Sequence, residues 1–276
     1  MVTHYNSQTN SALGCGCSVA SLESRELRYD AYTDHLSVAE RAKYASLPSQ
    51  SRKAEWLAGR LAAKYLFLNR LELSQGAESR QWSPTLAKLS SAALRAYSPW
   101  MYQEVEVVSN AGRPGLAWCG QTRMESISLS HSRSVSFASI ALGTPTVIDV
   151  ETTAPRIDAF YRSNFTEAEQ SWALRGADGE SIKANWFFTL LWTLKESALK
   201  LGWLNSLWNL PRLEIAGLPG ASSIGPFLCG KTISNDFAVF TVSVKEHCRV
   251  MRVRVAVTGT RNFILTVMNP LTGVVK

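Results

Sequence analysis

The sequence predicts an α+β fold built from two similar α/β halves, and three observations support this prediction. Short segments with alternating polar and apolar residues, typical of strands, occur in both halves of the chain. The last three, residues 237–244, 250–257 and 263–268, alternate regularly enough to form an antiparallel sheet. Each half also holds one long helical segment, and the C-terminal part lacks the strand–helix alternation of a doubly wound sheet.

The helix of the second half, residues 185–200, is apolar on nearly every side in its first turns, which predicts that it is buried. Glu196 and Lys200 lie four residues apart in it and share one face. They are either an ordinary helix pair or part of a functional site. Charges are costly in an apolar setting unless they are paired or bind a metal, so the second alternative places Glu196 in a cleft.

The helix of the first half, residues 52–70, follows a capping signal at Ser49 and carries Arg60 and Lys64 on one face. Taken alone, two cations on one face indicate a solvated surface. The order of elements nevertheless suggests a duplication, because this helix matches the second-half helix with its own charges at residues 195–200, and short strands flank both.

A turn signal at residues 143–145, Gly-Thr-Pro, gives the natural boundary between the halves. We therefore expect an N-terminal half at residues 1–145 and a C-terminal half at residues 146–276. A duplicated chain of this kind predicts a pseudo-twofold relation between the halves, with the active site in the cleft between them.

Two carboxylates mark the strand that opens the second half. Asp149 and Glu151 are two residues apart, so both point to one side of the strand while Ile148 and Val150 point to the other. Like charges on one side repel unless a cation lies between them. Oxygen ligands suit Mg²⁺ or Mn²⁺ rather than zinc. The alternative is an exposed strand face without a ligand.

Composition restricts the partners and the compartment. Lysine and arginine exceed aspartate and glutamate by seven (29 − 22), which favours anionic partners such as nucleotides, nucleic acid, an acidic protein or a membrane surface. There is no Lys/Arg block of the kind found in nucleic-acid tails and no apolar run of membrane-spanning length. The five cysteines are scattered and no secretory signal precedes them. We expect a cytoplasmic protein that binds neither nucleic acid nor membrane.

The motifs together resemble those of a known family. They are Gly59-Arg60-Leu61-Ala62-Ala63-Lys64, Gly112-Arg113-Pro114, Ser128-Leu129-Ser130-His131-Ser132, Val147-Ile148-Asp149-Val150-Glu151 and Trp192-Thr193-Leu194-Lys195-Glu196-Ser197-Ala198-Leu199-Lys200. In this order and at this separation they resemble the 4′-phosphopantetheinyl transferase superfamily. The resemblance is to its larger, pseudo-dimeric type, which activates the carrier proteins of peptide and polyketide synthases in secondary metabolite biosynthesis.

The resemblance implies a reaction and a metal site. Such enzymes transfer the 4′-phosphopantetheine arm of coenzyme A to a serine of an acyl or peptidyl carrier protein and release 3′,5′-ADP. The family's metal ligands fall on Asp149, Glu151 and Glu196, which would hold Mg²⁺, with Mn²⁺ as an alternative. The catalytic residues would be Glu196 and Lys200. Either Glu196 or a metal-bound water polarised by it would accept the proton of the serine.

The resemblance also assigns the nucleotide contacts. Lys200 would lie near the pyrophosphate of coenzyme A. Ser130, His131, Arg113 and Lys43 would contact the nucleotide and its 3′-phosphate, which places these contacts in the N-terminal half and the metal ligands in the C-terminal half. The expected partners are coenzyme A and a carrier protein, and the expected state is a monomer. The alternative is a catalytically silent relative that binds a carrier protein or a nucleotide.

Overall fold

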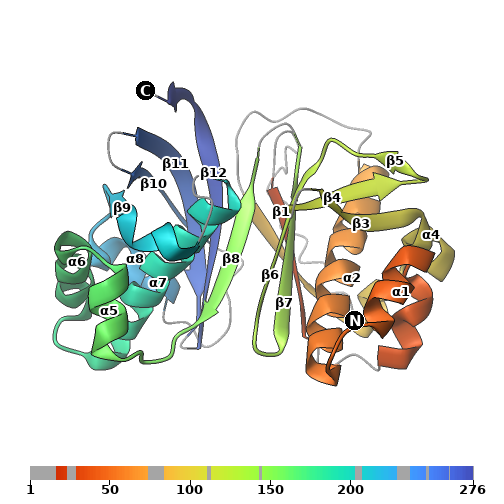
Figure 1. Ribbon diagram of the computed structural model, residues 1–276, viewed down its shortest axis with the longest axis horizontal. Helices are drawn as coiled ribbons and strands as arrows, with labels where there is room; N and C mark the ends of the chain where they lie inside the picture. The colour runs from red at the N-terminus through yellow and green to blue at the C-terminus, as the bar shows by residue number, and fades with distance from the viewer. Residues whose placement is uncertain are drawn as a thin grey trace. The chain divides into compact units, whose positions relative to one another are not determined.

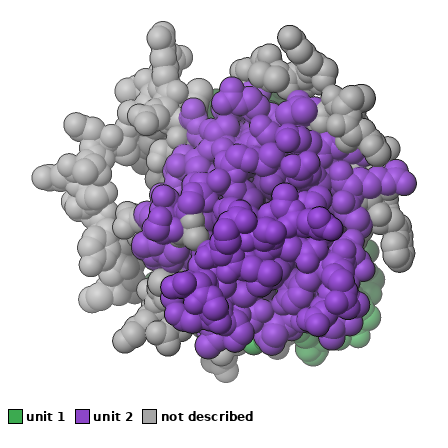
Figure 2. All heavy atoms as spheres, turned by 90° about the vertical axis from the view of Figure 1, so that its left-hand side faces the viewer, with its two compact units in different colours: residues 1–146 green, residues 147–276 purple. Residues whose placement is uncertain are grey.

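The computed structural model describes residues 17–23, 29–73, 84–110, 113–142, 145–202, 207–228, 237–246, 249–260 and 262–275 of the 276-residue chain. Contacts within the chain define two compact units, Met1–Thr146 (unit 1) and Val147–Lys276 (unit 2). Figure 2 colours unit 1 green and unit 2 purple. Helices and sheets both contribute to each unit, which confirms the α+β class (Figure 1).

Unit 1 combines two sheets with one long helix. Its four-stranded sheet has the order β2-β1-β7-β6, in which β1 and β2 are parallel and the other pairs antiparallel; its second sheet has the order β3-β4-β5. The strands are β1 (Cys17–Glu23), β2 (Pro84–Leu89), β3 (Val105–Asn110), β4 (Arg113–Trp118), β5 (Gln121–Thr122), β6 (Ser126–Ser132) and β7 (Val135–Ala141). The helices are η2 (Tyr29–His35), α1 (Val38–Ala45), α2 (Gln50–Leu73), α3 (Ser91–Leu94) and α4 (Pro99–Glu104).

The predicted first-half helix is α2, and its apolar face forms the core of unit 1. The Ser49 hydroxyl accepts the backbone N–H of Arg52, so the predicted capping signal is confirmed. Side chains at helical spacing, such as Leu57 and Leu61, are fully buried against β7 and β1. The alternation pattern did not predict β2, the parallel edge strand of this sheet.

Unit 2 is a single antiparallel sheet covered by helices. The strand order is β8-β12-β11-β10-β9, with β8 (Val147–Thr152), β9 (Leu213–Ala216), β10 (Ala238–Glu246), β11 (Arg249–Gly259) and β12 (Phe263–Val275). The helices are α5 (Asp158–Asn164), α6 (Glu167–Ala177), α7 (Ser181–Lys200), η3 (Leu207–Arg212) and α8 (Ala221–Leu228). The three C-terminal strands predicted from alternation are β10, β11 and β12, and they pair antiparallel as expected.

The buried second-half helix is α7, which packs on β8 and β12 (Figure 1). Its early apolar residues, among them Phe187, Leu190 and Leu191, lie in the core of unit 2, so the predicted burial is confirmed. The helix begins four residues before the predicted stretch. It ends at Lys200, and two residues later Gly202 has a φ of +80°, a left-handed conformation that glycine adopts without a side-chain clash.

The two units contain the same buried lysine–glutamate pair. In unit 1, the Lys64 Nζ atom forms an ion pair with Glu40, and Glu40 Oε1 accepts the backbone N–H of Val107 at 3.1 Å. Glu40 also closes a capping box with Ser37 at the start of α1. Both charged side chains are almost fully buried.

Unit 2 has the same arrangement at corresponding positions. The Lys195 Nζ atom lies 2.9 Å from Glu169 Oε2, and Glu169 Oε1 accepts the backbone N–H of Ile215 at 2.8 Å. Glu169 closes a capping box with Thr166 at the start of α6. The predicted duplication is therefore visible inside the units, with Lys195 as the counterpart of Lys64.

The expected solvated face of α2 was wrong. Lys64 has no exposed side-chain area, because its ammonium also donates to the carbonyl oxygens of His35 and Tyr102. The Arg60 guanidinium lies 3.4 Å from the centroid of the Trp56 ring and 4.0 Å from Glu40, and burial lowers the pKa of Arg60 to about 10. The sequence pattern predicted an exposed face because the shared partner of these cations, Glu40, lies on a separate helix, α1.

Several sequence features fall outside the described residues: Cys15, Cys229 and Cys248, and Gly112, Gly143 and Thr144 of the two turn motifs. Cys17 and Cys119, which the structure describes, are free thiols. Of the described helices, none combines the length and the apolar character that crossing a membrane requires.

Candidate active site

Three carboxylates converge in unit 2. Asp149 and Glu151 lie on β8 and Glu196 lies on α7, and one ligand atom from each falls within 4.8 Å of the other two. Alternate residues of β8 face α7, which packs directly on this strand and on β12. The Ser197 hydroxyl is 3.3 Å from that of Thr266 on β12 and helps to fix the helix at this height. The structure therefore brings together the three predicted metal ligands.

The electrostatics of this cluster favour a bound cation. Burial, followed by the charges of Asp149 and Glu151, raises the pKa of Glu196 to about 7. Burial and the charge of Asp149 also raise the pKa of Glu151. A divalent cation would remove this mutual repulsion, and carboxylate oxygens are ligands that Mg²⁺ accepts. The residues present thus fit a divalent metal.

Lys200 balances part of the negative charge. Its Nζ atom donates to Asp149 Oδ1 at 2.7 Å and to the carbonyl oxygen of Ile148 at 3.0 Å. The side chain of Lys200 is 30% exposed, while that of Asp149 is 2% exposed. Lys200 on α7 thus forms its ion pair with Asp149 on β8. The sequence had left open an ordinary pair with Glu196 on the same helix.

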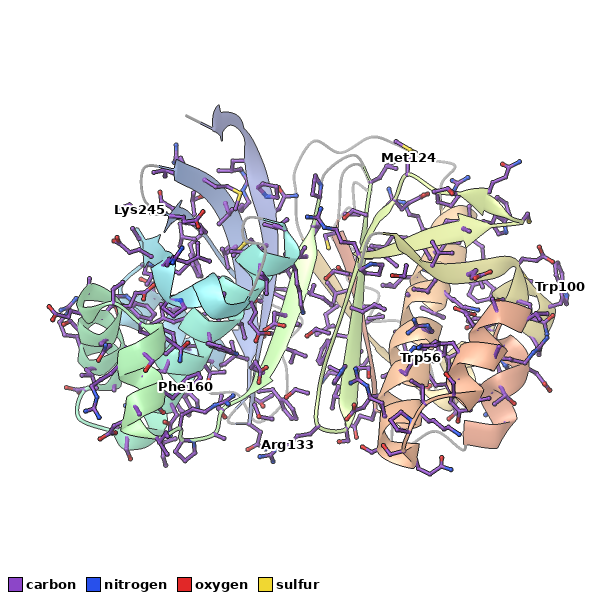
Figure 3. All side chains as sticks on the ribbon, viewed as in Figure 1. Trp56, Trp100, Met124, Arg133, Phe160 and Lys245 are labelled. Atoms are coloured by element: carbon purple, nitrogen blue, oxygen red, sulfur yellow. The ribbon has the colours of Figure 1, made fainter. Side chains whose placement is uncertain are left out.

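Arg156 is a second cation beside the cluster, and sequence reasoning missed it. Its Nη2 atom lies 3.7 Å from Glu151 Oε2, and its guanidinium lies 5.1 Å from the centroid of the Phe160 ring. Phe160 is labelled on α5 in Figure 3. The only signal in the sequence was a lone arginine after Pro155, five residues beyond Glu151, which is too common a pattern to indicate a site.

A cavity of about 800 Å³ extends from Arg156 over unit 2. It is lined by residues of α5, α6 and the first turns of α7, and the larger part of its lining is apolar. Leu174 and Ile182 line it and are themselves 58% and 64% exposed. The carboxylate cluster therefore has an open, largely apolar recess near it, on the side of Arg156.

Unit 1 has no equivalent cluster among its described residues, although it contains the same buried lysine–glutamate pair. The residue after the buried lysine is Glu196 in unit 2 but Tyr65 in unit 1. The residues of β1 that lie in the core beneath α2 are Ala20 and Leu22, where β8 of unit 2 has carboxylates. Apolar side chains and a tyrosine cannot bind a divalent cation in this way, so these positions of unit 1 offer no metal site.

The predicted nucleotide residues lie in unit 1. Ser130 and His131 occupy the end of β6, with Ser130 nearly buried and the side chain of His131 41% exposed. The Nε2 atom of His131 is 2.8 Å from Arg52 Nη1, and its Nδ1 atom is 3.5 Å from Glu55 Oε2. Arg52 and Glu55, both on α2, were not among the predicted site residues.

Lys43 and Arg113 lie on other elements of unit 1. Lys43 is in the last turn of α1 and Arg113 opens β4, where it pairs with Asn110 of β3. Both residues are exposed. Their assignment to the nucleotide stays a prediction.

Comparison with known proteins agrees with the motifs. Residues 148–223 match the family model described as the 4′-phosphopantetheinyl transferase superfamily. The match begins in β8 and includes Asp149, Glu151, Glu196 and Lys200. This match confirms the resemblance to the superfamily that the sequence motifs indicated.

Among solved structures, the chain is similar to the holo-(acyl-carrier-protein) synthase (AcpS) of Thermotoga maritima. The two are 21% identical, and the match covers 55% of this chain and 75% of that chain with a TM-score of 0.30. No curated protein sequence matches this chain.

Proposed function

We propose that this protein transfers the 4′-phosphopantetheine arm of coenzyme A to a serine of an acyl or peptidyl carrier protein and releases 3′,5′-ADP. The observation that carries the proposal is the cluster of Asp149, Glu151 and Glu196, which lies inside the segment that matches the transferase superfamily. A catalytically silent relative would not need to retain three mutually repelling carboxylates at one point.

The chemistry requires stabilisation of charge around a phosphorus atom. A bond forms between the serine oxygen and the phosphorus, while the bond from that phosphorus to the oxygen of 3′,5′-ADP breaks. Mg²⁺ held by the three carboxylates would neutralise the pyrophosphate oxygens on which negative charge accumulates. The family uses a divalent metal, and its identity as Mg²⁺ is part of the proposal.

The residues of the chain supply the remaining parts. Lys200 places a positive charge beside Asp149, where it would stabilise the departing 3′,5′-ADP. We propose Glu196, on the helix side of the cluster, as the acceptor of the serine proton. Because Lys200 and Glu196 both lie on α7, the packing of this helix on β8 sets their distances to the pyrophosphate.

The nucleotide part of coenzyme A would be bound by unit 1. His131, with Ser130, Arg113 and Lys43, is proposed to contact the nucleotide and its 3′-phosphate. The repeated lysine–glutamate pair supports assignment to the larger, pseudo-dimeric type of the family, since both units carry it. A monomer of this type would contain one active site, because unit 1 lacks the carboxylates at the corresponding described positions.

Incubation with coenzyme A, Mg²⁺ and a purified apo-carrier protein, followed by intact mass measurement, tests the proposal. We expect the carrier protein to gain one phosphopantetheine arm, and a chelator to prevent the gain. A carrier panel should include acyl and peptidyl carrier proteins. If no carrier is modified while coenzyme A still binds, the protein is the catalytically silent relative instead.

A further inference from the structure

We propose that Arg156 couples metal binding to pyrophosphate binding in unit 2, because its guanidinium opposes a divalent cation that binds alone and favours one that binds with coenzyme A. The inference rests on the proposed function and adds to it a residue outside the motifs that resemble the family. Three features of Arg156 support it: its loose ion pair with Glu151, the aromatic ring beside its guanidinium, and the backbone contact that holds its segment.

Arg156 acts on the carboxylate cluster through Glu151. Its Nη2 atom lies 3.7 Å from Glu151 Oε2, and a ligand atom of Glu151 lies within 4.8 Å of ligand atoms of Asp149 and Glu196. A cation bound by the three carboxylates would therefore lie close to the guanidinium, and like charges at short range repel each other. Without the cation, the same guanidinium offsets part of the repulsion among the carboxylates. Arg156 thus stabilises the metal-free cluster and competes with the metal.

The ion pair between Arg156 and Glu151 is weak enough for another acceptor to replace it. The distance of 3.7 Å exceeds the length of a hydrogen bond, and the two side chains are 41% and 24% exposed. Ion pairs that water reaches in this way contribute little to stability. The N–H groups of the guanidinium can therefore turn to a better acceptor, and phosphate oxygens match their planar fork.

Aromatic side chains keep the guanidinium beside the cluster. It lies 5.1 Å from the centroid of the Phe160 ring, which Figure 3 labels on α5, and this distance allows a cation–π contact. The Phe160 ring packs on that of Trp192 on α7, with the ring centroids 5.0 Å apart. The indole N–H of Trp192 donates to the carboxylate of Glu196. The aromatic support of Arg156 is therefore connected to the helix that carries Glu196.

Hydrogen bonds hold the backbone of Arg156. Its N–H donates to the hydroxyl oxygen of Tyr161 at 2.9 Å, and that hydroxyl donates to Asn185 Oδ1 at 3.1 Å. Tyr161 lies on α5 and Asn185 on α7, so the segment between β8 and α5 is tied to both helices. Because the backbone is held, only the side chain of Arg156 has to turn when a ligand binds, and little freedom is lost.

The position of Arg156 next to a metal ligand selects the pyrophosphate as its second partner. In phosphoryl transfer the metal binds phosphate oxygens directly, so such an oxygen would also lie near Glu151 and Arg156. The guanidinium would then repel the metal when the metal binds alone, and would share an anion with it when coenzyme A is present. This difference is a coupling free energy between the metal and coenzyme A.

Binding of Mn²⁺, followed by the electron paramagnetic resonance signal of the free ion, tests this coupling without turnover. Without nucleotide, Arg156→Ala should bind Mn²⁺ about two- to fivefold more tightly than wild type, because one repelling charge is removed. Coenzyme A should improve Mn²⁺ binding about tenfold less in Arg156→Ala than in wild type, because a charge-assisted contact to the pyrophosphate is lost. With 3′,5′-ADP, which has no pyrophosphate, the coupling should be nearly the same in both proteins.

Two further variants separate charge from geometry. Arg156→Lys should bind Mn²⁺ alone as wild type does but recover only part of the coupling, since lysine keeps the charge without the planar fork. The matched control is Arg162→Ala, which removes a positive charge from the last turn of α5, on the lining of the same cavity, and should change neither quantity. Mn²⁺ binding by Arg156→Ala that is no tighter than wild type, or a tightening that Arg162→Ala reproduces, would overturn the proposal. So would an equal loss of coupling for coenzyme A and 3′,5′-ADP.

The two proposals fail in different ways. If wild-type protein binds neither Mn²⁺ nor coenzyme A, the proposed function fails and this inference fails with it. If wild-type protein modifies a carrier protein while Arg156→Ala couples Mn²⁺ to coenzyme A as strongly as wild type does, only the role of Arg156 is wrong. Thermal unfolding of each variant in chelator checks that the substitutions leave unit 2 folded.

Discussion

At the scale of single residues, the carboxylate cluster is an arrangement that should destabilise the folded protein unless a cation is bound. Asp149, Glu151 and Glu196 are placed where each makes the ionisation of the others less favourable, and burial adds to the effect. Lys200 offsets part of the charge on Asp149. Binding of a divalent cation should therefore stabilise the folded protein. Without a bound cation, the cluster should lower the free energy of unfolding at neutral pH.

This balance predicts a pH effect on the metal-free protein. Glu196 has a folded-state pKa of about 7, above its ordinary value, so the folded state holds the proton more tightly than the unfolded state. Its favourable contribution is present below the ordinary glutamate pKa of about 4.3 and is lost as the pH rises through about 7. We expect the melting temperature in chelator to fall over this window more for wild type than for Glu196→Gln.

The comparison with Glu196→Gln removes the influence of groups such as His35, whose pKa burial lowers and which therefore changes stability in the opposite direction. Adding Mg²⁺ near neutral pH should restore the melting temperature of wild type but raise that of Glu196→Gln much less. Parallel melting curves for the two proteins across the window would show that Glu196 does not carry this charge.

At the scale of elements, the sequence predicted what local pattern determines. Alternation gave β10, β11 and β12, and the apolar run gave α7, because these segments bury one or all faces against neighbouring elements. Asp149 and Glu151 could be placed on one side of a strand for the same reason. The strand β2 was missed because its partner β1 is distant in sequence and its pairing is parallel.

Contacts between residues that are far apart in the sequence could not be predicted from local sequence patterns. Nothing in the sequence joins Lys64 to Glu40 or Lys195 to Glu169, since each pair spans two helices. Arg52 and Glu55 could not be assigned to His131 either, because β6 follows α2 by more than fifty residues and returns beside it only in the folded sheet. These contacts depend on tertiary structure, which one sequence without an alignment does not specify.

The buried pair on α6 and α7 leads to a prediction about stability. Lys195→Met should destabilise unit 2 by about 3–5 kcal/mol, because Glu169 would keep its charge in a buried position without a counter-charge. The double substitution Lys195→Met/Glu169→Gln should cost less than the sum of the single losses. Urea unfolding at constant slope measures both free energies.

A surface pair provides the control for this experiment. Lys183 and Glu180 form an ion pair at the start of α7 in which both side chains are more than one third exposed. Lys183→Met should change the free energy of unfolding by about 1 kcal/mol or less. If Lys195→Met costs no more than this control, the repeated buried pair does not stabilise the unit and its recurrence needs another explanation.

At the scale of the whole molecule, the basic excess of the chain predicts how it would meet the proposed carrier protein. An excess of positive charge favours an acidic partner, so part of the encounter should depend on charge. Raised salt should increase the apparent Michaelis constant for the carrier protein several-fold more than that for coenzyme A. Steady-state kinetics at a series of salt concentrations, with either substrate varied, would measure the two constants.

The opposite outcome of the salt experiment is equally informative. If both constants rise together, or only the coenzyme A value changes, the basic excess serves the nucleotide, and an apolar surface binds the carrier protein. The cavity lined by α5, α6 and α7, with Leu174 and Ile182 exposed in it, would then be the first surface to substitute.

Asp149, Glu151 and Glu196 are proposed to hold the divalent metal on which transfer depends. The most direct test compares wild type with Asp149→Ala by intact mass of an apo-carrier protein incubated with coenzyme A and Mg²⁺, after circular dichroism has shown that both proteins are folded. We predict complete modification by wild type and none by Asp149→Ala, because two remaining carboxylates bind Mg²⁺ poorly. Near-normal modification by Asp149→Ala at ordinary Mg²⁺ concentration would contradict the account.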